Sequence, residues 1–319
     1  MLINVLLFAF GFFLLIKGGD WFVDAASSIA HRFNMPELLI GATVVAIGTT
    51  LPEVMVSAQG ALAGSGAIAF GNAVGSVICN TSLIAAITLL VRPAPVERRT
   101  LILPSAAFFI AAAFYCFNAY AFGAFSRLSS LILLAMFVIY MAVTVMQMKS
   151  APAHAAEPGE AAEEGETTLA HDVITLVVGA LVIAIGARLL VDNAQVIATA
   201  LGVPESVIAL TLVALGTSLP ELVTAITSLI KGLGALSLGN IIGANLFNLV
   251  LVSGTATAIA PFNLSSASAT SLSVDIPLML AVMLVMTVPA LVTGKLRRWQ
   301  GAVLLTAYAC YCAFQFFLT

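Results

Sequence analysis

Long apolar runs separated by short polar breaks dominate the chain. Ten such runs can be distinguished, and proline, glycine or charged residues mark the breaks between them. Runs of about 20 residues are typical of helices that cross a bilayer and are far longer than strands. The first and sixth runs exceed the thickness of a bilayer, so we expect these two helices to be tilted. The predicted spans are residues 2–30, 36–61, 67–91, 100–118, 128–148, 172–199, 204–230, 234–259, 273–293 and 299–317.

The composition also indicates a bilayer environment. Hydrophobic residues make up 61% of the 319 residues and charged residues only 8%, whereas soluble domains contain about 25% charged residues. We predict an all-α integral membrane protein whose partner is the lipid bilayer; no nucleic acid, protein partner or cofactor is suggested. The N-terminus lacks the basic start and cleavage site of a signal peptide, so its apolar run is expected to stay as the first helix. The cysteines lie in apolar runs and are interpreted as small buried residues: Cys79, Cys116, Cys310 and Cys312.

The basic residues predict how the helices are oriented. Nine of them lie in connections that follow odd-numbered spans, whereas the opposite side holds only Arg127. Because cytoplasmic loops carry an excess of Lys and Arg, we expect these nine in the cytoplasm and both termini on the extracytoplasmic side. The expected location is therefore the cytoplasmic (inner) membrane. The nine residues are Arg32, Arg92, Arg98, Arg99, Lys149, Lys231, Lys295, Arg297 and Arg298.

Residues 150–170, SAPAHAAEPGEAAEEGETTLA, form the one long polar stretch of the sequence. They contain five glutamates and are rich in Ala, Gly and Pro without an apolar period, which is typical of a disordered segment. We predict an acidic cytoplasmic linker between a first five-helix repeat, residues 1–149, and a second five-helix repeat, residues 171–319.

The two halves are copies of one another. A shift of 168 positions places PELLIGATVVAIGTTLPEVMVS (36–57) over PESVIALTLVALGTSLPELVTA (204–225), with 11 of 22 positions identical. The same shift places GNAVGSVICN (71–80) over GNIIGANLFN (239–248). Because five is an odd number of helices, the second half must enter the membrane from the opposite side, which predicts an inverted repeat. In transporters of this kind the substrate site lies near the midplane, where interrupted helices meet.

Each copy of the first motif carries a proline and a glutamate inside an apolar run. Pro52 has no N–H, so the carbonyl of Gly48 loses its helical partner, and Pro220 repeats this in the second half. Freed carbonyls are tolerated in a membrane only where protein, water or an ion satisfies them. Glu53 and Glu221 lie three or four residues from hydroxyl side chains that can share their helix face. These are Thr49, Thr50, Thr217 and Ser218.

Polar side chains recur every fourth residue on the following helix. The positions are Asn72, Ser76 and Asn80, matched in the second half by Asn240, Ala244 and Asn248. Nearby glycines predict close approach of a neighbouring helix: Gly71, Gly75, Gly239 and Gly243. Carboxylates, hydroxyls, amides and free carbonyls are hard oxygen ligands that suit Ca²⁺ or Na⁺, and an acid at mid-membrane marks function by default. The structural alternative is a kinked helix with a protonated glutamate that is hydrogen-bonded for packing.

GATVVAIGTTLPE and LTLVALGTSLPE, each followed by GNxxG(S/A)xxxN, resemble the two alpha-repeats of the cation/calcium exchanger superfamily, and within it the bacterial and archaeal sodium/calcium antiporters. The resemblance covers all ten spans. It implies alternating-access exchange of Ca²⁺ for Na⁺, in which the long first and sixth helices slide across the rest. It makes Glu53 and Glu221 the central carboxylates of four clustered ion sites. The other implied ligands are Thr49, Thr50, Thr217 and Ser218, the backbone of Ala46 and Ala214, and Ser76, Asn80 and Asn248.

The chain departs from this family pattern at three positions. Well-studied sodium/calcium antiporters carry a serine where it has Ala244, an aspartate where it has Asn248, and GSN where it reads GSV at 75–77. Glu53 and Glu221 then supply a formal charge of at most −2. One Ca²⁺ or two monovalent ions would balance this charge. We therefore hypothesise that the stoichiometry or the coupling ion differs from three Na⁺ per Ca²⁺.

Other functions compete with Ca²⁺/Na⁺ exchange. Ca²⁺/H⁺ or other cation antiport is one of them, since two adjacent glutamates can share a proton. A passive cation channel normally surrounds its pore with repeated subunits or charged rings, whereas an inverted pair converges on one site. No protease motif supports a membrane enzyme, and transport involves no covalent chemistry, so no enzymatic activity is predicted.

Charged residues inside the first and sixth spans allow two interpretations. They are Lys17, Asp20 and Asp24 in the first, and Arg188 and Asp192 in the sixth. Ion pairs near the cytoplasmic halves of long tilted helices are one interpretation. The other is that these residues line the ion path or hold a gate closed.

Overall fold

The structure, a computed structural model, describes the chain except for residues 94, 151–167, 203–215, 265–270 and 319. The described part is helical, with π-helical segments labelled η, apart from two short strands. The first half contains α1 (Leu2–Arg32), α2 (Glu37–Ile40), η1 (Gly41–Val45), α3 (Ala46–Leu62), α4 (Gly66–Cys79), η2 (Asn80–Ala85), α5 (Ala86–Val91), α6 (Arg98–Phe117), η3 (Asn118–Phe122) and α7 (Arg127–Ser150). The second contains α8 (Leu169–Ala200), α11 (Leu219–Ile230), α12 (Gly234–Phe247), η5 (Asn248–Val252), α13 (Ser253–Ile259), η7 (Ser271–Asp275), α14 (Ile276–Thr293) and α15 (Arg298–Leu318). Strands β1 (Ala124–Phe125) and β2 (Phe262–Asn263) pair antiparallel, with Phe125 opposite Phe262.

Eight helical stretches of the described residues are long and apolar enough to cross a membrane. Each agrees with a predicted span to within about four residues at either end. Of the predicted span 204–230, the described part contains α11, and the span 299–317 corresponds to α15. A total of ten crossing helices stays a prediction. The linker prediction needs one correction, because α8 begins at Leu169, inside residues 150–170, while residues 151–167 lie outside the described residues.

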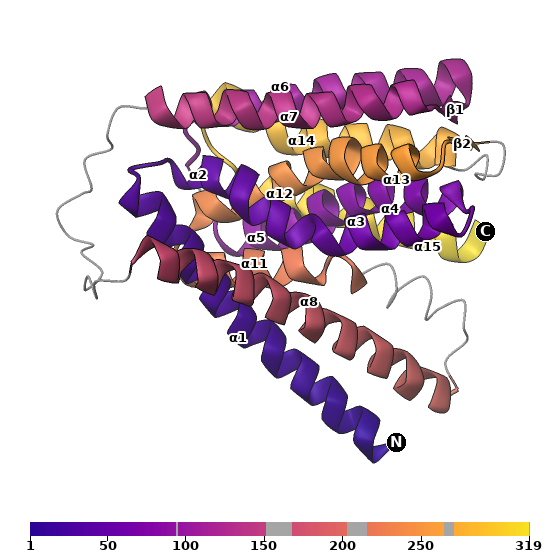
Figure 1. Ribbon diagram of the computed structural model, residues 1–319, viewed down its shortest axis with the longest axis horizontal. Helices are drawn as coiled ribbons and strands as arrows, with labels where there is room; N and C mark the ends of the chain where they lie inside the picture. Colours follow the sequence, from indigo (N-terminus) through magenta and orange to yellow (C-terminus); the bar gives the residue numbers. More distant parts are fainter. Residues whose placement is uncertain (94, 151–167, 203–215, 265–270, 319) are drawn as a thin grey trace.

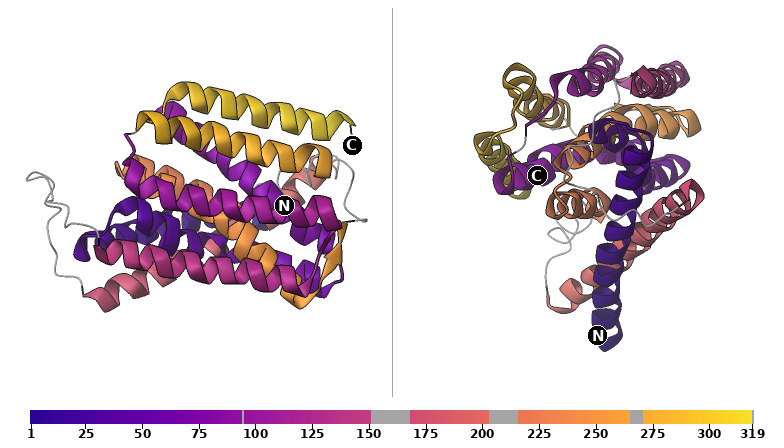
Figure 2. Two further views of the ribbon diagram at one scale, coloured as in Figure 1. Left: turned by 90° about the horizontal axis from the view of Figure 1, so that it is seen from above. Right: turned by 90° about the vertical axis from the view of Figure 1, so that its left-hand side faces the viewer.

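Helices α1 and α8 lie side by side, run in opposite directions and diverge from the other helices toward the N-terminus of α1 (Figure 1). The right-hand view of Figure 2 shows the same pair extending beyond the rest of the molecule. Glycines on both helices face the partner's backbone. A Cβ built on Gly11 would lie 2.8 Å from the carbonyl oxygen of Gly186, and one built on Gly179 would lie 2.9 Å from the nitrogen of Phe22. The two helices therefore pack backbone against backbone, as small residues permit in membranes.

Burial identifies the centre of the bundle. In the continuous stretch from α12 to α13, 89% of the most apolar window is buried, against 22% in each of α1 and α8. α12 contacts α3, η1, η2 and α11, so it joins the motifs of both halves. α1 and α8 instead expose many large apolar side chains, which is the surface that lipid-facing helices require.

The glycines of α12 confirm one of the close approaches expected from the sequence. A Cβ built on Gly243 would lie 2.6 Å from the carbonyl oxygen of Ala42, and one on Gly239 would collide with the carbonyl of Leu38. The first half thus packs directly on the backbone of α12. A Cβ built on the matching Gly71 or Gly75 would meet no heavy atom within 4 Å outside its own helix, among the residues that the structure describes.

The two copies of the Pro–Glu motif differ in local structure. α3 continues through Pro52 without ending, whereas Pro220 lies in the first turn of α11, directly after a turn at 217–218. A proline in the first turn loses no helical hydrogen bond, because the first N–H groups have no partner in the helix. Within the described residues, the interruption expected in both copies is therefore present only in the second. The first copy is irregular at η1, just before α3.

Candidate ion-binding site

Glu53 and Glu221 are buried where α3 and α11 meet. Both residues are 0% exposed, the two helices are in contact, and the carboxyl groups are close enough to interact electrostatically. None of their four carboxyl oxygens has a hydrogen-bond partner among the described residues. A buried carboxylate without a partner is very costly, so this pair requires cations or protons.

The two motifs that supply the carboxyl pair also carry four hydroxyl groups. Thr50 and Ser218 are buried, and within the described part of the chain their hydroxyl oxygens have no hydrogen-bond partner. Thr49 is buried and Thr217 is half-buried. The Thr49 hydroxyl lies beside the carboxyl group of Glu221, which belongs to the other half of the chain. One hydroxyl of the first half therefore reaches the carboxylate of the second.

Two asparagines at matching positions open π-helical segments in the two halves. η2 begins at Asn80 and η5 at Asn248, and both residues are fully buried. Neither side-chain amide has a hydrogen-bond partner in the described ranges. π-Helical turns are rare and are frequent at functional sites. Of the remaining predicted ligands, Ser76 and Ala46 are buried, whereas Ala214 lies outside the described residues.

The predicted ligands that the structure describes come from five neighbouring segments: α3, α4, η2, α11 with the turn before it, and η5. α3 contacts α4, α11 and η5, and α11 contacts η2. Six of the eleven predicted residues carry buried polar side-chain atoms without a hydrogen-bond partner in the described part: Thr50, Glu53, Asn80, Ser218, Glu221 and Asn248. Because buried polar groups are normally hydrogen-bonded, this concentration of exceptions at one place indicates a ligand.

The donor set fits a hard cation carried as substrate. Carboxylate, amide, hydroxyl and carbonyl oxygens are the ligands of Ca²⁺, which takes about 6–8 of them. Among the described residues there is no group of three or more His, Cys, Asp or Glu side chains that could hold a metal ion. The candidate site offers two carboxylates and a larger number of neutral oxygens.

Two further asparagines, which were expected on the polar stripe but not among the ligands, connect the two halves. The Thr49 Oγ1 donates to the Asn240 Oδ1 at 3.1 Å, and the Thr217 Oγ1 donates to the Asn72 Oδ1 at 3.4 Å. The two threonines occupy matching positions in the halves, and so do the two asparagines, so the bonds are reciprocal. The repeated GN dipeptide was the available signal, but a repeat shows which positions are equivalent and not what each residue contacts.

Four of the five charged residues expected inside the first and sixth spans form ion pairs. Arg188 and Asp192 pair at 3.6 Å on the exposed surface of α8, which confirms this pairing. Asp24 of α1 lies 2.8 Å from Lys231, and Asp20 lies 3.7 Å from the same lysine. Since Lys231 directly follows α11, these contacts connect α1 to the helix that carries a central carboxylate.

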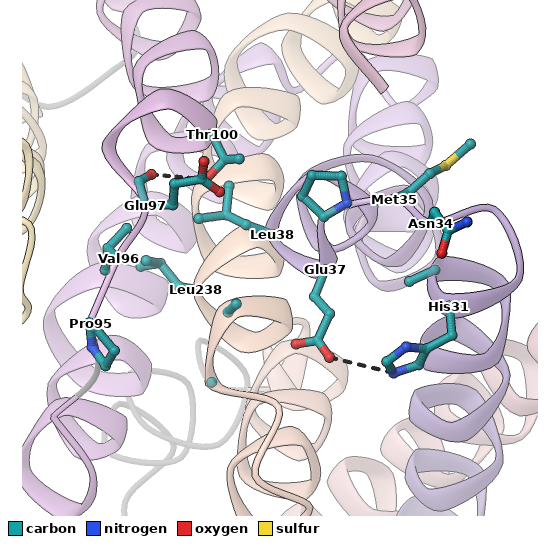
Figure 3. A pocket seen from close by; sticks show the side chains of 14 residues that line it. His31, Asn34, Met35, Glu37, Leu38, Pro95, Val96, Glu97, Thr100 and Leu238 are labelled. Carbon is teal, nitrogen blue, oxygen red and sulfur yellow. Dashed lines mark hydrogen bonds and ion pairs between the residues drawn. The ribbon is translucent and has the colours of Figure 1, made fainter. Parts of the chain in front are cut away.

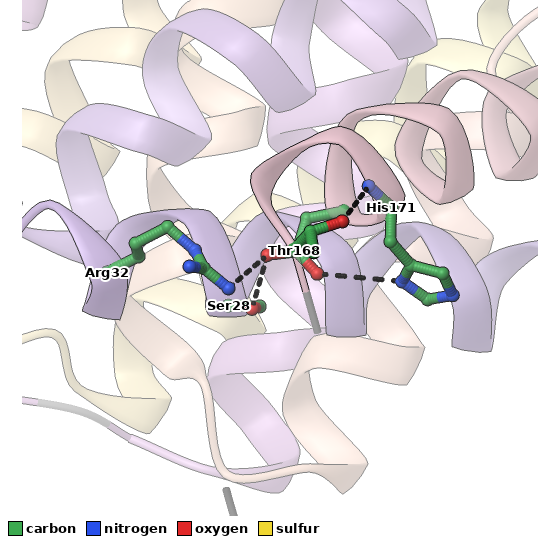
Figure 4. Close-up of polar contacts among 5 residues, drawn as sticks. Ser28, Arg32, Thr168 and His171 are labelled. Atoms are coloured by element: carbon green, nitrogen blue, oxygen red, sulfur yellow. Dashed lines mark hydrogen bonds and ion pairs between the residues drawn. The ribbon is translucent and has the colours of Figure 1, made fainter. Parts of the chain in front are cut away.

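Asp172 joins the start of α8 to the end of α1 (Figure 4). Its buried Oδ2 accepts hydrogen bonds from the Ser28 Oγ at 2.9 Å and from Arg32 at 3.2 Å. His171 lies 3.8 Å from the other carboxyl oxygen, and its backbone N–H donates to the Thr168 hydroxyl that caps α8. The two long helices are thus held together at this end by charge and along their length by glycine contacts.

A cavity of about 320 Å³ lies apart from these groups, between the end of α1 and the starts of α2, α6 and α12 (Figure 3). His31 and Glu37 face one another on one side of it at 3.9 Å, and Glu97 and Thr100 lie on the other side. Its described lining contains none of the predicted ligands, so this cavity is separate from the candidate site.

The chain is similar to known exchangers and antiporters over nearly its whole length. The family described as "Sodium/calcium exchanger protein" matches residues 3–146 and 171–317. The putative antiporter CaxA of Alkalimonas amylolytica is 36% identical over 318 residues, covering 98% of this chain and 98% of that protein. The sodium/calcium exchanger MaX1 of Methanosarcina acetivorans is 31% identical over 350 residues, covering 99% of each.

The fold is also similar to solved structures. The sodium-calcium exchanger NCX_Mj, in a structure soaked with Na⁺ and Sr²⁺, superimposes with a TM-score of 0.81 at 31% sequence identity, covering 98% of both chains. A structure of the same exchanger soaked with Na⁺ without Ca²⁺ gives a TM-score of 0.80 at 32% identity. The similarity therefore extends over both halves, with the candidate site between them.

Proposed function

Because this multi-pass membrane protein belongs to the sodium/calcium exchanger family, we propose that it exchanges Ca²⁺ for Na⁺ across the cytoplasmic membrane by alternating access. The observation that supports this most strongly is the buried pair Glu53 and Glu221, whose oxygens have no hydrogen-bond partner among the described residues. Around them lie neutral oxygens from both halves. Such a site is built to hold a dehydrated cation.

The two halves form an inverted repeat of five helices each, with ten crossings in all. Two pieces of evidence support this arrangement. α1 and α8 run antiparallel although they are the equivalent first helices of the two halves. The bonds from Thr49 to Asn240 and from Thr217 to Asn72 are each other's counterparts. A pseudo-two-fold axis in the membrane plane produces this kind of crossed symmetry, and it brings the substrate site to the midplane.

The transported cations are held in four clustered sites around the carboxylates of Glu53 and Glu221, and neutral oxygens of the two motifs complete these sites. The neutral ligands are Thr49, Thr50, Thr217, Ser218, the carbonyls of Ala46 and Ala214, and Ser76, Asn80 and Asn248. Ala244 is buried in α12 but has no hydroxyl to offer, and Asn248 carries no charge. The two carboxylates balance one Ca²⁺ or two Na⁺, and a third Na⁺ would be buried without compensation. The exchange ratio is therefore below three Na⁺ per Ca²⁺.

The unpartnered carboxylates also favour exchange over a passive leak. If the site closed without cations or protons, two buried negative charges would face each other without a hydrogen-bond donor from the described residues. The cost of that state is high, so the site changes its accessibility only when it is occupied. Obligatory occupation couples the outward movement of one ion to the inward movement of the other.

The movement that exposes the site to one side at a time belongs to α1 and α8. These two helices are bound to each other backbone against backbone and lie at the periphery of the bundle with most of their surface toward lipid. They can therefore slide as a unit across the buried helices. The ligand-bearing helices stay packed on α12, which fixes the geometry of the site.

Counter-ion dependence tests the proposal. The full chain is reconstituted in vesicles, and Ca²⁺ uptake is measured under an imposed Na⁺, K⁺ or H⁺ gradient, with the Glu53→Gln protein as the inactive control. Uptake driven by the Na⁺ gradient alone supports Ca²⁺/Na⁺ exchange. Uptake driven only by the pH gradient supports Ca²⁺/H⁺ antiport instead, and Ca²⁺ flux without any counter-ion would show a channel. Exchange of two Na⁺ for one Ca²⁺ moves no net charge and should produce no current, whereas a current that reverses at the voltage for 3:1 exchange contradicts the ratio proposed above.

A further inference from the structure

The crossed hydrogen bonds determine where the protons of two hydroxyl ligands point. A threonine hydroxyl has one proton to donate and two lone pairs that can accept a hydrogen bond or bind a cation. Which way the proton turns decides whether the oxygen can serve as a cation ligand without rearrangement. In this structure the neighbours of Asn72 and Asn240 settle the orientation of Thr217 and Thr49.

Asn72 can be oriented in only one way. Its Nδ2 donates to the backbone carbonyl of Glu53 at 3.2 Å and to the Ser57 hydroxyl at 2.9 Å. A carbonyl only accepts, so the amide nitrogen must face it, and the Oδ1 must face Thr217. Because the Oδ1 has no proton, the Thr217 hydroxyl is the donor in the 3.4 Å contact between them.

Asn240 is fixed by the same reasoning in the other half. Its Nδ2 donates to the Thr224 hydroxyl at 2.9 Å. That hydroxyl directs its own proton to the carbonyls of Pro220 at 2.8 Å and Glu221 at 3.0 Å, so it can only accept from Asn240. The Oδ1 of Asn240 consequently faces Thr49, whose hydroxyl is the donor in the 3.1 Å contact. The Ala46 carbonyl is a second acceptor for this hydroxyl, but at 3.4 Å it is the more distant one.

The second hydroxyl of each motif is not held in this way. Thr50 and Ser218 have no hydrogen-bond partner for their hydroxyls in the described part of the chain. In each half the first hydroxyl is therefore bound by the asparagine of the opposite half, and the second is not. The Glu221 carboxyl also lies beside Thr49, but its oxygens accept no hydrogen bond in the described part of the chain.

We propose that Asn72 and Asn240 are positioning residues that turn the protons of Thr217 and Thr49 away from the ion site, so that both hydroxyls present lone pairs to the cation. This inference rests on the proposed function, since it assumes that the site between Glu53 and Glu221 carries cations. The asparagines act through the threonines and do not touch the ion. Each also joins the hydroxyl ligand of one half to the helix of the other.

A double-mutant cycle tests the inference on the purified full-length protein. Ca²⁺ binding and its displacement by Na⁺ are measured by calorimetry for Thr49→Val, Asn240→Leu and the double variant, and each protein's melting temperature is recorded. Loss of one orienting hydrogen bond predicts about a three- to tenfold higher half-saturating concentration for at least one of the two cations in each single variant. The double variant should match Thr49→Val, because without the hydroxyl Asn240 has nothing to orient.

A control outside the ion site separates positioning from folding. Asn118→Leu removes a buried amide that binds the Phe114 carbonyl and the Ser129 hydroxyl, and it should leave cation binding unchanged. If Asn240→Leu does not fold, the cycle with Thr217→Val and Asn72→Leu applies, since Asn72 is only half-buried.

The possible outcomes decide between the two claims. Additive effects in the cycle, or unchanged affinities for both cations in Asn240→Leu, would overturn the positioning role even if exchange itself is intact. If the unmodified protein binds Ca²⁺ but does not exchange it for Na⁺, the proposed function fails while the cycle still decides the role of the asparagines. If it binds neither cation, both claims fall.

Discussion

Replacement of Gly11 by alanine tests the close packing of α1 on α8. The new Cβ would lie 2.8 Å from both the Gly186 carbonyl oxygen and the Leu190 nitrogen, whereas ordinary contact begins near 3.4 Å. The two backbones must therefore separate by about 0.6 Å, and a gap of that size removes roughly a quarter to a half of the dispersion energy of each contact that it opens. Overpacking of this kind costs about 1–3 kcal/mol.

The higher helix propensity of alanine opposes the steric cost, so the sign of the change in melting temperature distinguishes a packed face from an open one. Alanine stabilises a helix interior relative to glycine by about 0.5–1 kcal/mol, so Gly11→Ala would raise the stability of α1 if this face were open. The steric cost is larger, and we expect a net destabilisation of about 1–2 kcal/mol. It is read as a lower melting temperature of the purified protein in detergent. Ala9→Leu, at an exposed position of the same helix, is the control and should leave the melting temperature unchanged. A higher melting temperature for Gly11→Ala would refute the backbone-to-backbone packing.

The ion pairs give two further predictions. Arg32→Ala removes a charged hydrogen bond from Asp172, whose side chain is 4% exposed, and should destabilise the folded protein by about 1.5–3 kcal/mol. Arg188→Ala breaks a pair whose side chains are 83% and 62% exposed, and should destabilise it by less than about 1 kcal/mol. Equal melting temperatures for these two variants would contradict the conclusion that the Arg32–Asp172 pair stabilises the protein more than the Arg188–Asp192 pair. Lys231→Ala removes the 2.8 Å contact with Asp24 and should lower the melting temperature by an amount that disappears in concentrated choline chloride, because salt screens partly exposed pairs. A loss that is independent of salt would show that the lysine acts through packing.

The convergence of Glu53 and Glu221 was predictable because two independent patterns indicate it. The helical period placed each glutamate next to hydroxyl residues in an apolar run. The shift of 168 positions showed that the two runs are equivalent, and an inverted repeat brings equivalent helices together at mid-depth. Burial of both carboxyl groups agrees with this expectation.

The different fates of the two prolines were not predictable from the motif. The sequences around Pro52 and Pro220 are nearly the same, yet α3 continues through Pro52, whereas α11 begins at Leu219, one residue before Pro220. Which backbone conformation is adopted depends on the neighbours that pack on each copy, and those neighbours differ between the halves. A local pattern contains no information about them.

Long-range polar contacts were also beyond the sequence. Lys17 lies closest to Asp20 and Asp24 along the chain, but the structure pairs Asp24 with Lys231, which is 207 residues away. The contact depends on the angle at which α1 crosses α11. The crossed bonds between threonines and asparagines were missed for the same reason, although all four residues were visible in the repeated motifs.

Ca²⁺ binding to Glu53→Gln and Glu221→Gln tests the central claim most directly. Each variant keeps the shape of the side chain and removes one of two buried charges; at an effective dielectric constant near 20, one pair of unit charges 4 Å apart contributes about 4 kcal/mol. We therefore expect calorimetry to show Ca²⁺ affinity weakened by at least about a thousandfold in both variants, and unchanged in Glu97→Gln at an exposed position. Retention of affinity within about tenfold in either variant would contradict a cation site shared by the two carboxylates.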